Sequence, residues 1–315
     1  MDKKMSSVLL SLGVVLAIFA IVMFGFGARD PLGPFNFSVD QATLVLRFGF
    51  VALGLLIAFA VYLATKENKA WEIGTREVVY MAIGAALYAI FSYLFNGTVF
   101  AVPSLSQVAL RPAIAIPMFF GYAFGPVVGF FSGAVGNMFG DALTGFGLSP
   151  QWSIGNGLVG FVAGLVALFA NKKQSMNTVL YVSAGLALLA TVLYFMNQSQ
   201  ANLNFYDPEN NIFGDAQISL FAGVSILIGF ALVLGVRFAF GKDENIAAAV
   251  TWSMLGNILG IGFAAISDVW INGYSLTAAV VGEFLPAAGP NLIFAAILVP
   301  LLVVAYSAVQ RQSGR

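Results

Sequence analysis

Long apolar runs, separated by short polar segments, are the feature that most restricts the fold of this chain. Runs of about 20 residues recur along its 315 residues, and each is long enough to cross the ~30 Å hydrocarbon core of a bilayer as a helix. In lipid, only helices and closed barrels satisfy their backbone hydrogen bonds. The alternating segments of about ten residues that form a membrane β-barrel are absent. The sequence therefore predicts an all-α integral membrane protein.

Composition supports this class and excludes several functions. Only 9% of the residues are charged and 60% are hydrophobic, whereas soluble domains carry about 25% charged residues. The absence of cysteine and histidine excludes disulfides, thiolate metal sites and histidine-based catalysis. Zero net charge without a basic tract argues against nucleic acid as a partner. We expect neither enzymatic activity nor a cofactor.

The pattern predicts about ten transmembrane helices. The first is expected to be retained, because no cleavage site follows a short apolar core. The fourth is short and contains Pro112 and Pro117, so it is tilted, kinked or partly re-entrant. The predicted helices span residues 8–27, 43–65, 77–95, 111–124, 126–143, 154–170, 179–197, 218–240, 246–270 and 290–308.

Basic residues gather on one side of this ten-helix alternation, which the positive-inside rule assigns to the cytoplasm. Both termini are then cytoplasmic, as expected of a multi-pass protein of the cell's inner membrane. The opposite loops are acidic, with Arg29 as an exception. The residues on the basic side are Lys3, Lys4, Lys66, Lys69, Arg76, Lys172, Lys173, Lys242, Arg311 and Arg315.

Residues 111–147 form a nearly unbroken apolar stretch with a charge near each end. Arg111 opens it and Asp141 lies near its close. A Gly-Pro pair at Gly125 and Pro126 indicates a tight turn between two short helices. Charges at bilayer depth are costly and are kept mostly where they face a cavity or a partner. The stretch therefore predicts an embedded binding site rather than a simple anchor.

Candidate substrate-binding residues follow from this stretch and the next helices. Asn137 lies four residues before Asp141, so both point the same way and either line a pocket or hydrogen-bond a neighbouring helix. Arg111 pairs with an anionic ligand, with Asp141 or with outer headgroups. Trp152 either stacks on a ligand or anchors the interface. The candidate set is Arg111, Asn137, Asp141, Trp152, Asn156, Asn257, Asp268 and Asn291.

Three polar residues in the second half are expected at different depths. Asn257 is mid-membrane and should face the bundle, because an asparagine in lipid needs a partner. Glu283 is expected in a solvated outer loop, and Asn291 is expected to open the last helix just after Gly289 and Pro290.

The third predicted helix carries alanines at four-residue spacing, which allows close helix contacts. The ordinary interpretation is that these alanines pack inside the protein. The more specific interpretation is that they dock to another membrane protein. The alanines concerned are Ala82, Ala85, Ala86 and Ala89.

Several segments resemble the substrate-binding S component of energy-coupling factor (ECF) vitamin transporters, especially the riboflavin-transporter-like group. They are MAIGAALYAIF, RPAIAIPMFFGYAFGPVVGFFSGAVGNMFGDAL, WSIGNGLVGFVAGL and GPNLIFAAILVPLLVVAY. The resemblance implies a six-helix module that binds a vitamin or related molecule from outside. It also implies docking, through the alanine-rich helix, to a transmembrane coupling subunit driven by two cytoplasmic ATPases. The pocket would involve the outer loop 96–110 and the outer halves of later helices.

The resemblance divides the chain into four parts. Residues 71–170 and 246–315 correspond to helices one to four and five to six of the module, and residues 1–70 and 171–245 are additional transmembrane hairpins. Relatives often have histidine where Asn137 stands, which this chain lacks.

The chain also lacks a P-loop, so any ATP-driven transport needs partner subunits. The alternatives are a secondary transporter coupled to protons or cations through Asp141, Asp268 and Glu283, and a structural subunit of a membrane complex.

Overall fold

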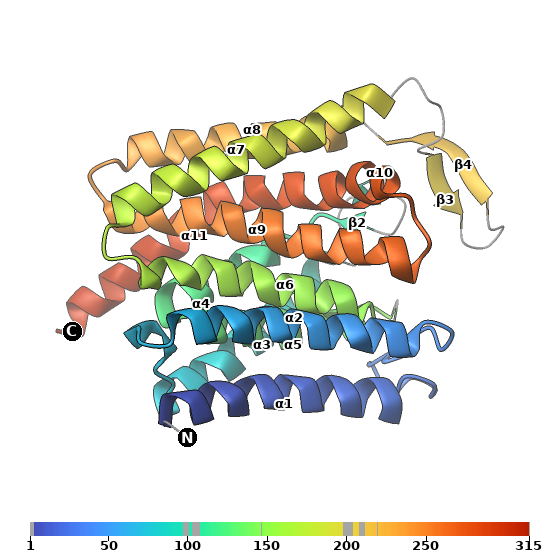
Figure 1. The fold of residues 1–315 in the computed structure, drawn as a ribbon, viewed down its shortest axis with the longest axis horizontal. Helices are drawn as coiled ribbons and strands as arrows, with labels where there is room; N and C mark the ends of the chain where they lie inside the picture. The colour runs from blue at the N-terminus through green and yellow to red at the C-terminus, as the bar shows by residue number, and fades with distance from the viewer. Residues whose placement is uncertain are drawn as a thin grey trace.

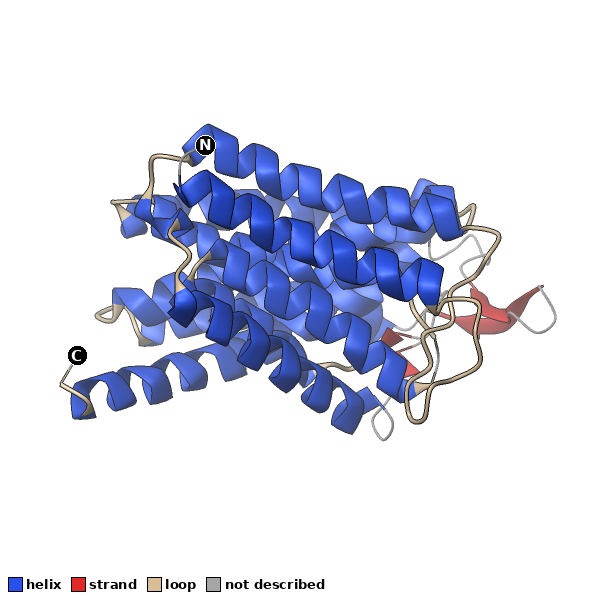
Figure 2. Cartoon of the chain, turned by 90° about the horizontal axis from the view of Figure 1, so that it is seen from below, coloured by secondary structure: helices blue, strands red, loops and turns tan. Residues whose placement is uncertain are grey.

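The computed structural model describes residues 3–96, 101–102, 108–145, 147–197, 204–207, 212–218 and 220–314. Its helices lie side by side in one bundle (Figures 1 and 2), which confirms the predicted all-α membrane fold. Eight helical segments of the described chain are long and apolar enough to cross a bilayer. They are α1 (Lys3–Gly25), α2 (Leu44–Thr65), α3 (Thr75–Asn96), α6 (Pro150–Gly164) together with the 3-10 turn Leu165–Leu168 that extends it, α7 (Lys172–Asn197), α8 (Leu220–Ala239), α9 (Glu244–Ile271) and the combined segment Leu276–Gln312.

The predicted Gly-Pro turn separates two shorter helices, α4 (Ala115–Phe124) and α5 (Pro126–Thr144). Gly125 adopts φ = 105°, a conformation that favours glycine, and Pro126 starts α5 where its missing N–H costs nothing. A 3-10 turn at Pro112–Ile114 precedes α4. At 1.5 Å per residue, this 13-residue unit reaches only about 20 Å, less than the ~30 Å core. The unit that Arg111 precedes is thus too short to span the bilayer alone.

The last helix begins earlier than predicted, and the expected outer loop around Glu283 does not exist. A short α10 (Leu276–Ala278) passes through a π-helical turn (Ala279–Phe284) into α11 (Leu285–Gln312). Glu283 is 0% exposed, and Asn291 lies inside α11 instead of opening it. Gly289 and Pro290 do not mark a helix start as predicted. Packed neighbouring helices and local π-helical adjustments allow proline inside a membrane helix.

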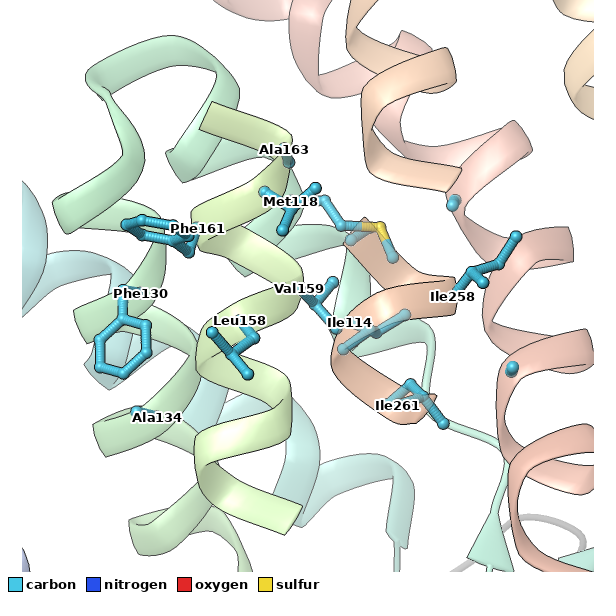
Figure 3. Packing of buried hydrophobic residues seen from close by; sticks show 14 of the residues in the cluster. Ile114, Met118, Phe130, Ala134, Leu158, Val159, Phe161, Ala163, Ile258 and Ile261 are labelled. Atoms are coloured by element: carbon cyan, nitrogen blue, oxygen red, sulfur yellow. The ribbon is translucent and has the colours of Figure 1, made fainter. Parts of the chain in front are cut away.

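Four helices, α4, α5, α6 and α9, form the centre of the bundle. Leu158 and Phe161 of α6 point towards Phe130 and Ala134 of α5, whereas Val159 lies on the side facing α9 (Figure 3). Glycines let α4, α5 and α6 approach at backbone distance. A Cβ on Gly160 would overlap the backbone of Gly129. The glycines of α5 and α6 thus serve packing inside the bundle.

The two additional hairpins flank this centre. Helix α1 packs on α2 and α5, and α2 packs on α6. Helix α7 packs on α9, and α8 packs on α11. In Figure 1 the α1–α2 pair and the α7–α8 pair lie on opposite sides of the bundle, and the N- and C-termini lie at the same end.

Two short antiparallel β-ladders lie at the end of the bundle opposite the termini. Strand β1 (Ala101–Val102) pairs with β2 (Val108–Ala109), and β3 (Asn204–Asp207) pairs with β4 (Ile212–Gln217). The predicted pocket wall at 96–110 falls partly outside the described residues.

Candidate functional site

A partly buried ion pair joins α5 to the segment before α4, with the Asp141 carboxylate more enclosed than the Arg111 guanidinium. The Arg111 guanidinium donates to Asp141 Oδ1 at 3.0 Å and to Asn137 Oδ1 at 2.7 Å. Asn137 Nδ2 donates to Asp141 Oδ2 at 2.7 Å, as expected for residues one turn apart on a helix. In the structure Arg111 pairs with Asp141, one of the partners that the sequence left open.

Side chains from α3 and α6 extend this cluster, which we call the Arg111 network. The Tyr88 hydroxyl donates to Asn156 Oδ1 at 2.9 Å, and Asn137 Nδ2 reaches Ser153 Oγ at 3.1 Å. Tyr88, Asn137 and Ser153 are each 0% exposed. Sequence reasoning missed Tyr88 and Ser153. The only signal for Tyr88 was a hydroxyl on the same helix face as Ala85, which packs against α5.

A second cluster, the Asp268 network, lies where α6 begins and α9 ends. Trp152 Nε1 donates to Asp268 Oδ2 at 2.8 Å, and Gln151 Nε2 donates to Asp268 Oδ1 at 2.9 Å. Asp268 is almost fully buried. The Trp152 indole is thus held by a carboxylate and does more than anchor an interface.

The N-terminal hairpin supplies the cation of the Asp268 network. Arg47 of α2 is buried, and its Nη1 donates to Gln151 Oε1 at 2.9 Å. Its Nε donates to the Thr43 hydroxyl at 2.8 Å. Sequence reasoning missed Arg47. An arginine one turn into an apolar helix on the otherwise acidic side was the available signal.

The hydrogen-bond chain continues from Arg47 to the loop between α1 and α2. Thr43 Oγ1 donates to Asp40 Oδ2 at 2.7 Å, and this bond lowers the pKa of the Asp40 carboxyl. Asp40 therefore stays ionised close to the end of α2 that carries Arg47.

The same loop between α1 and α2 lies on the end of α5. Asn36 Nδ2 donates to Gly145 O at 2.7 Å, and Asn36 N donates to Ala142 O at 2.8 Å. The Phe35 and Phe37 rings stack at 5.6 Å, and both pack edge-on against Phe139. This loop covers α5 next to Asp141.

The first two turns of α6 connect the two networks. Gln151 and Trp152 belong to the Asp268 network, whereas Ser153 and Asn156 belong to the Arg111 network. Asn156 Nδ2 also donates to Trp152 O at 2.9 Å. The assembly offers amide and guanidinium donors, carboxylate acceptors and an indole ring, which suits recognition of a small polar heterocycle. In the described part of the chain, no group of three or more acidic side chains is placed to hold a metal ion.

Known proteins match this chain over the region of the Arg111 network. A family profile described as "ECF-type riboflavin transporter, S component" matches residues 72–201. Over 184 residues, the chain is 31% identical to a UPF0397 protein of Vibrio atlanticus, covering 97% of that protein and 55% of this chain. The chain belongs to the family of ECF-type riboflavin transporter S components. A UPF0397 protein of Aliivibrio salmonicida is 28% identical over 162 residues, covering 86% of that protein and 50% of this chain.

No solved structure matches this S component significantly. The matched residues 72–201 include the whole Arg111 network, from Tyr88 to Asn156. Arg47 and Asp268 lie outside the profile match, so the second network joins residues from beyond this region.

Two predicted site residues of this S component lie apart from both networks. Asn257 Nδ2 donates to Ala288 O at 2.8 Å, which ties α9 to α11 inside the bundle as its depth predicted. Asn291 is buried in α11, and within the described residues its side chain hydrogen-bonds to neither network.

The predicted docking alanines fall on two different faces of α3. Ala82 and Ala86 are exposed, whereas Ala85 and Ala89 are buried. Ala85 lies against Gly136 and Ala89 against Gly140, so the small residues of α3 and α5 pack together. Ala85 and Ala89 are therefore unavailable to an outside partner, which corrects the four-residue docking face to Ala82 and Ala86.

Proposed function

We propose that this chain is the membrane-embedded substrate-binding subunit of an ATP-driven importer for a vitamin or a related small molecule. The observation that carries the proposal is the pair of polar networks meeting at the start of α6, in a protein of the S-component family. Riboflavin is the first candidate, because the matching family is described by it.

The chemistry of the two networks supports this function. A flat heterocycle can stack on Trp152 while its carbonyl and ring N–H groups exchange hydrogen bonds with Asn137, Asn156 and Asp141. Apart from the bond of Asn156 Nδ2 to Trp152 O, the partners of these groups are side chains, so rotamer changes can transfer their hydrogen bonds to a ligand. The proposed substrate site comprises Arg111, Asn137, Asp141, Trp152, Asn156 and Asp268, with Asn257 and Asn291 as further candidates along α9 and α11.

Energy for import would come from partners. We propose a transmembrane coupling subunit that contacts Ala82 and Ala86 of α3, and two cytoplasmic ATPases that drive it. In this scheme residues 71–170 and 246–315 form the substrate-binding module, whereas residues 1–70 and 171–245 form hairpins that flank it. The basic end of the bundle would face the cytoplasm, with both termini there.

Mass spectrometry of small molecules that copurify with the gently solubilised protein tests the substrate assignment. We expect one vitamin-like heterocycle at near-stoichiometric amount in the wild-type protein and a reduced amount in Asp141→Ala. Riboflavin binding is followed separately by quenching of its fluorescence. Recovery of only lipids and detergent, with no heterocycle binding, would contradict the proposal.

The mode of energy coupling has its own test. Uptake into cells should require the ATPase partners and persist when ionophores collapse ion gradients. Transport by the purified chain alone in liposomes would instead identify a secondary transporter. A chain that binds no small molecule but is required to assemble a larger complex would be a structural subunit.

A further inference from the structure

A cavity of about 720 Å³ opens at the basic end of the bundle, far along the helices from the two polar networks. It lies where the N-terminal hairpin meets α3 and the α4–α5 turn. Its charged lining comes from Lys3 and Lys4 of α1, Lys69 and Glu72 of the connection to α3, and Arg76 and Glu77 of α3. The volume falls within the range of about 300–1,000 Å³ typical of small-molecule sites.

The lining of this basic cavity carries net positive charge, with four basic and two acidic side chains. Glu77 is already compensated, because it accepts from Arg76 Nε and from Gly74 N, each at 2.8 Å. Among the described residues, neither Lys3 nor Lys69 forms an ion pair or a side-chain hydrogen bond. Two ammonium groups are thus available to an anion.

The position of the basic cavity indicates which anion it meets. Its lining comes from the ends of the apolar helices α1 and α3 and also includes Tyr122 and Phe124. Helices long enough to span a bilayer end near its headgroup region. The Phe124 ring stacks on Tyr80 at 3.8 Å, which provides an apolar surface beside the charges. Basic pockets between transmembrane helices on the cytoplasmic side suit anionic lipid headgroups.

We propose that the basic cavity binds the phosphodiester headgroup of an anionic phospholipid, with Lys3 and Lys69 as its principal contacts. Because the start of α1 and the start of α3 line the same cavity, the N-terminal hairpin contributes to a lipid site near the beginning of the helix proposed to dock a partner. This inference is independent of the proposed substrate and can be tested without it.

Native mass spectrometry of the detergent-solubilised full chain measures the expected preference. The probes are dioleoyl-phosphatidylglycerol and dioleoyl-phosphatidylcholine, which share acyl chains and differ in headgroup charge. Wild-type protein should retain phosphatidylglycerol preferentially. Lys3→Gln combined with Lys69→Gln should lower this preference by roughly ten-fold or more. Glu72→Gln should raise it, because it removes a negative charge from the lining.

The control pair Lys173→Gln with Lys242→Gln removes the same charge from exposed positions that do not line the cavity. It should keep the wild-type preference, and matching circular dichroism and melting curves would show that both pairs fold. Equal losses in the two pairs would reduce the effect to diffuse surface charge and overturn the proposal. So would the absence of a headgroup preference in the wild type. Binding of inorganic phosphate alone, without phosphatidylglycerol preference, would identify a soluble-anion site instead.

Discussion

Arg111 and Asp141 are held together by the cost of burying charge. Each charge would be costly to enclose alone, whereas the cluster with Asn137 gives both Asp141 oxygens and both Arg111 Nη atoms a hydrogen-bond partner. Breaking a buried pair by removing one partner leaves an uncompensated charge. Replacing one of these residues can therefore affect both folding and ligand binding. The variants used as tests have to distinguish a loss of folding from a loss of binding.

Variants of Asp141 and Trp152 test the proposed substrate site. Asp141→Asn keeps the shape but removes the charge, and Trp152→Phe keeps an aromatic ring but removes the Nε1–H that binds Asp268. Loss of a charge-assisted hydrogen bond costs about 1.5–3 kcal/mol, so affinity should fall by roughly ten-fold or more. Calorimetry with the ligand identified by mass spectrometry measures this. Unchanged affinity in both variants would move the site elsewhere.

Arg47 tests whether the N-terminal hairpin supports that site. In Arg47→Gln the shorter side chain loses its bonds to Gln151 and Thr43, so α6 should hold Trp152 less firmly and ligand affinity should fall several-fold. Arg47→Lys keeps the positive charge but lacks the several N–H donors of the guanidinium. Its ligand affinity should therefore lie between those of the wild type and Arg47→Gln. Arg29→Gln, on an exposed arginine of the same hairpin, is the control and should bind normally. If Arg29→Gln and Arg47→Gln weaken binding equally, the role assigned to Arg47 is incorrect.

Helices α5 and α6 pack closely because glycines at their contact carry no side chain. Gly133 faces the backbone of Asn156, so any side chain there must push α6 away from α5. The same close approach recurs between Gly129 and Gly160. Because Asn137 and Asn156 sit on these two helices, the geometry of the Arg111 network depends on their separation.

Gly133→Ala should therefore destabilise the protein, although alanine is the better helix former. Overpacking in a tight interface costs about 1–3 kcal/mol. Gly13→Ala on α1 is the matched control, since nothing lies within 4 Å of the added Cβ. It should be neutral or stabilising by up to about 1 kcal/mol. Thermal unfolding in detergent compares the two, and equal stabilities would show that α5 and α6 can separate freely.

The exposed face of α3 is the surface on which we predict that a coupling subunit docks. Ala86→Trp and Ala82→Trp should block close approach of a coupling subunit, abolishing copurification and uptake while the isolated protein still binds ligand. Ala60→Trp is the control, because Ala60 is equally exposed on α2, outside the proposed module. Normal transport by both α3 variants would refute this docking face.

The whole bundle has two chemically different ends. One end holds both termini and the basic cavity, and the other holds the two ladders (Figure 1). A membrane protein keeps its Lys- and Arg-rich loops cytoplasmic. We therefore predict that the end with both termini faces the cytoplasm and that the end with the two ladders faces outside.

Single cysteines test this orientation without background, because the chain has none. Leu32→Cys lies in the exposed outer loop of the N-terminal hairpin, and Ser313→Cys lies at the exposed end of α11. A membrane-impermeant thiol reagent should label the first in intact cells and the second only after permeabilisation. The reverse pattern would invert the topology.

The sequence alone determined the membrane class, the Gly-Pro turn and most helices, because each depends on local composition. Apolar length decides what can span a bilayer, and glycine followed by proline restricts the backbone wherever it occurs. The pairing of Asn137 with Asp141 was likewise predictable, since a four-residue spacing on a helix brings two side chains together. Family resemblance also followed from these segments.

Only the tertiary structure decided which distant residues meet. Arg47 and Gln151 are 104 positions apart, and no local pattern links them. Glu283 is buried and Ala85 faces inward because neighbouring helices cover them, whereas the sequence shows only a Gly-Pro pair and an alanine stripe. Burial is a property of packing between helices, and helix periodicity leaves open which apolar face meets protein and which meets lipid.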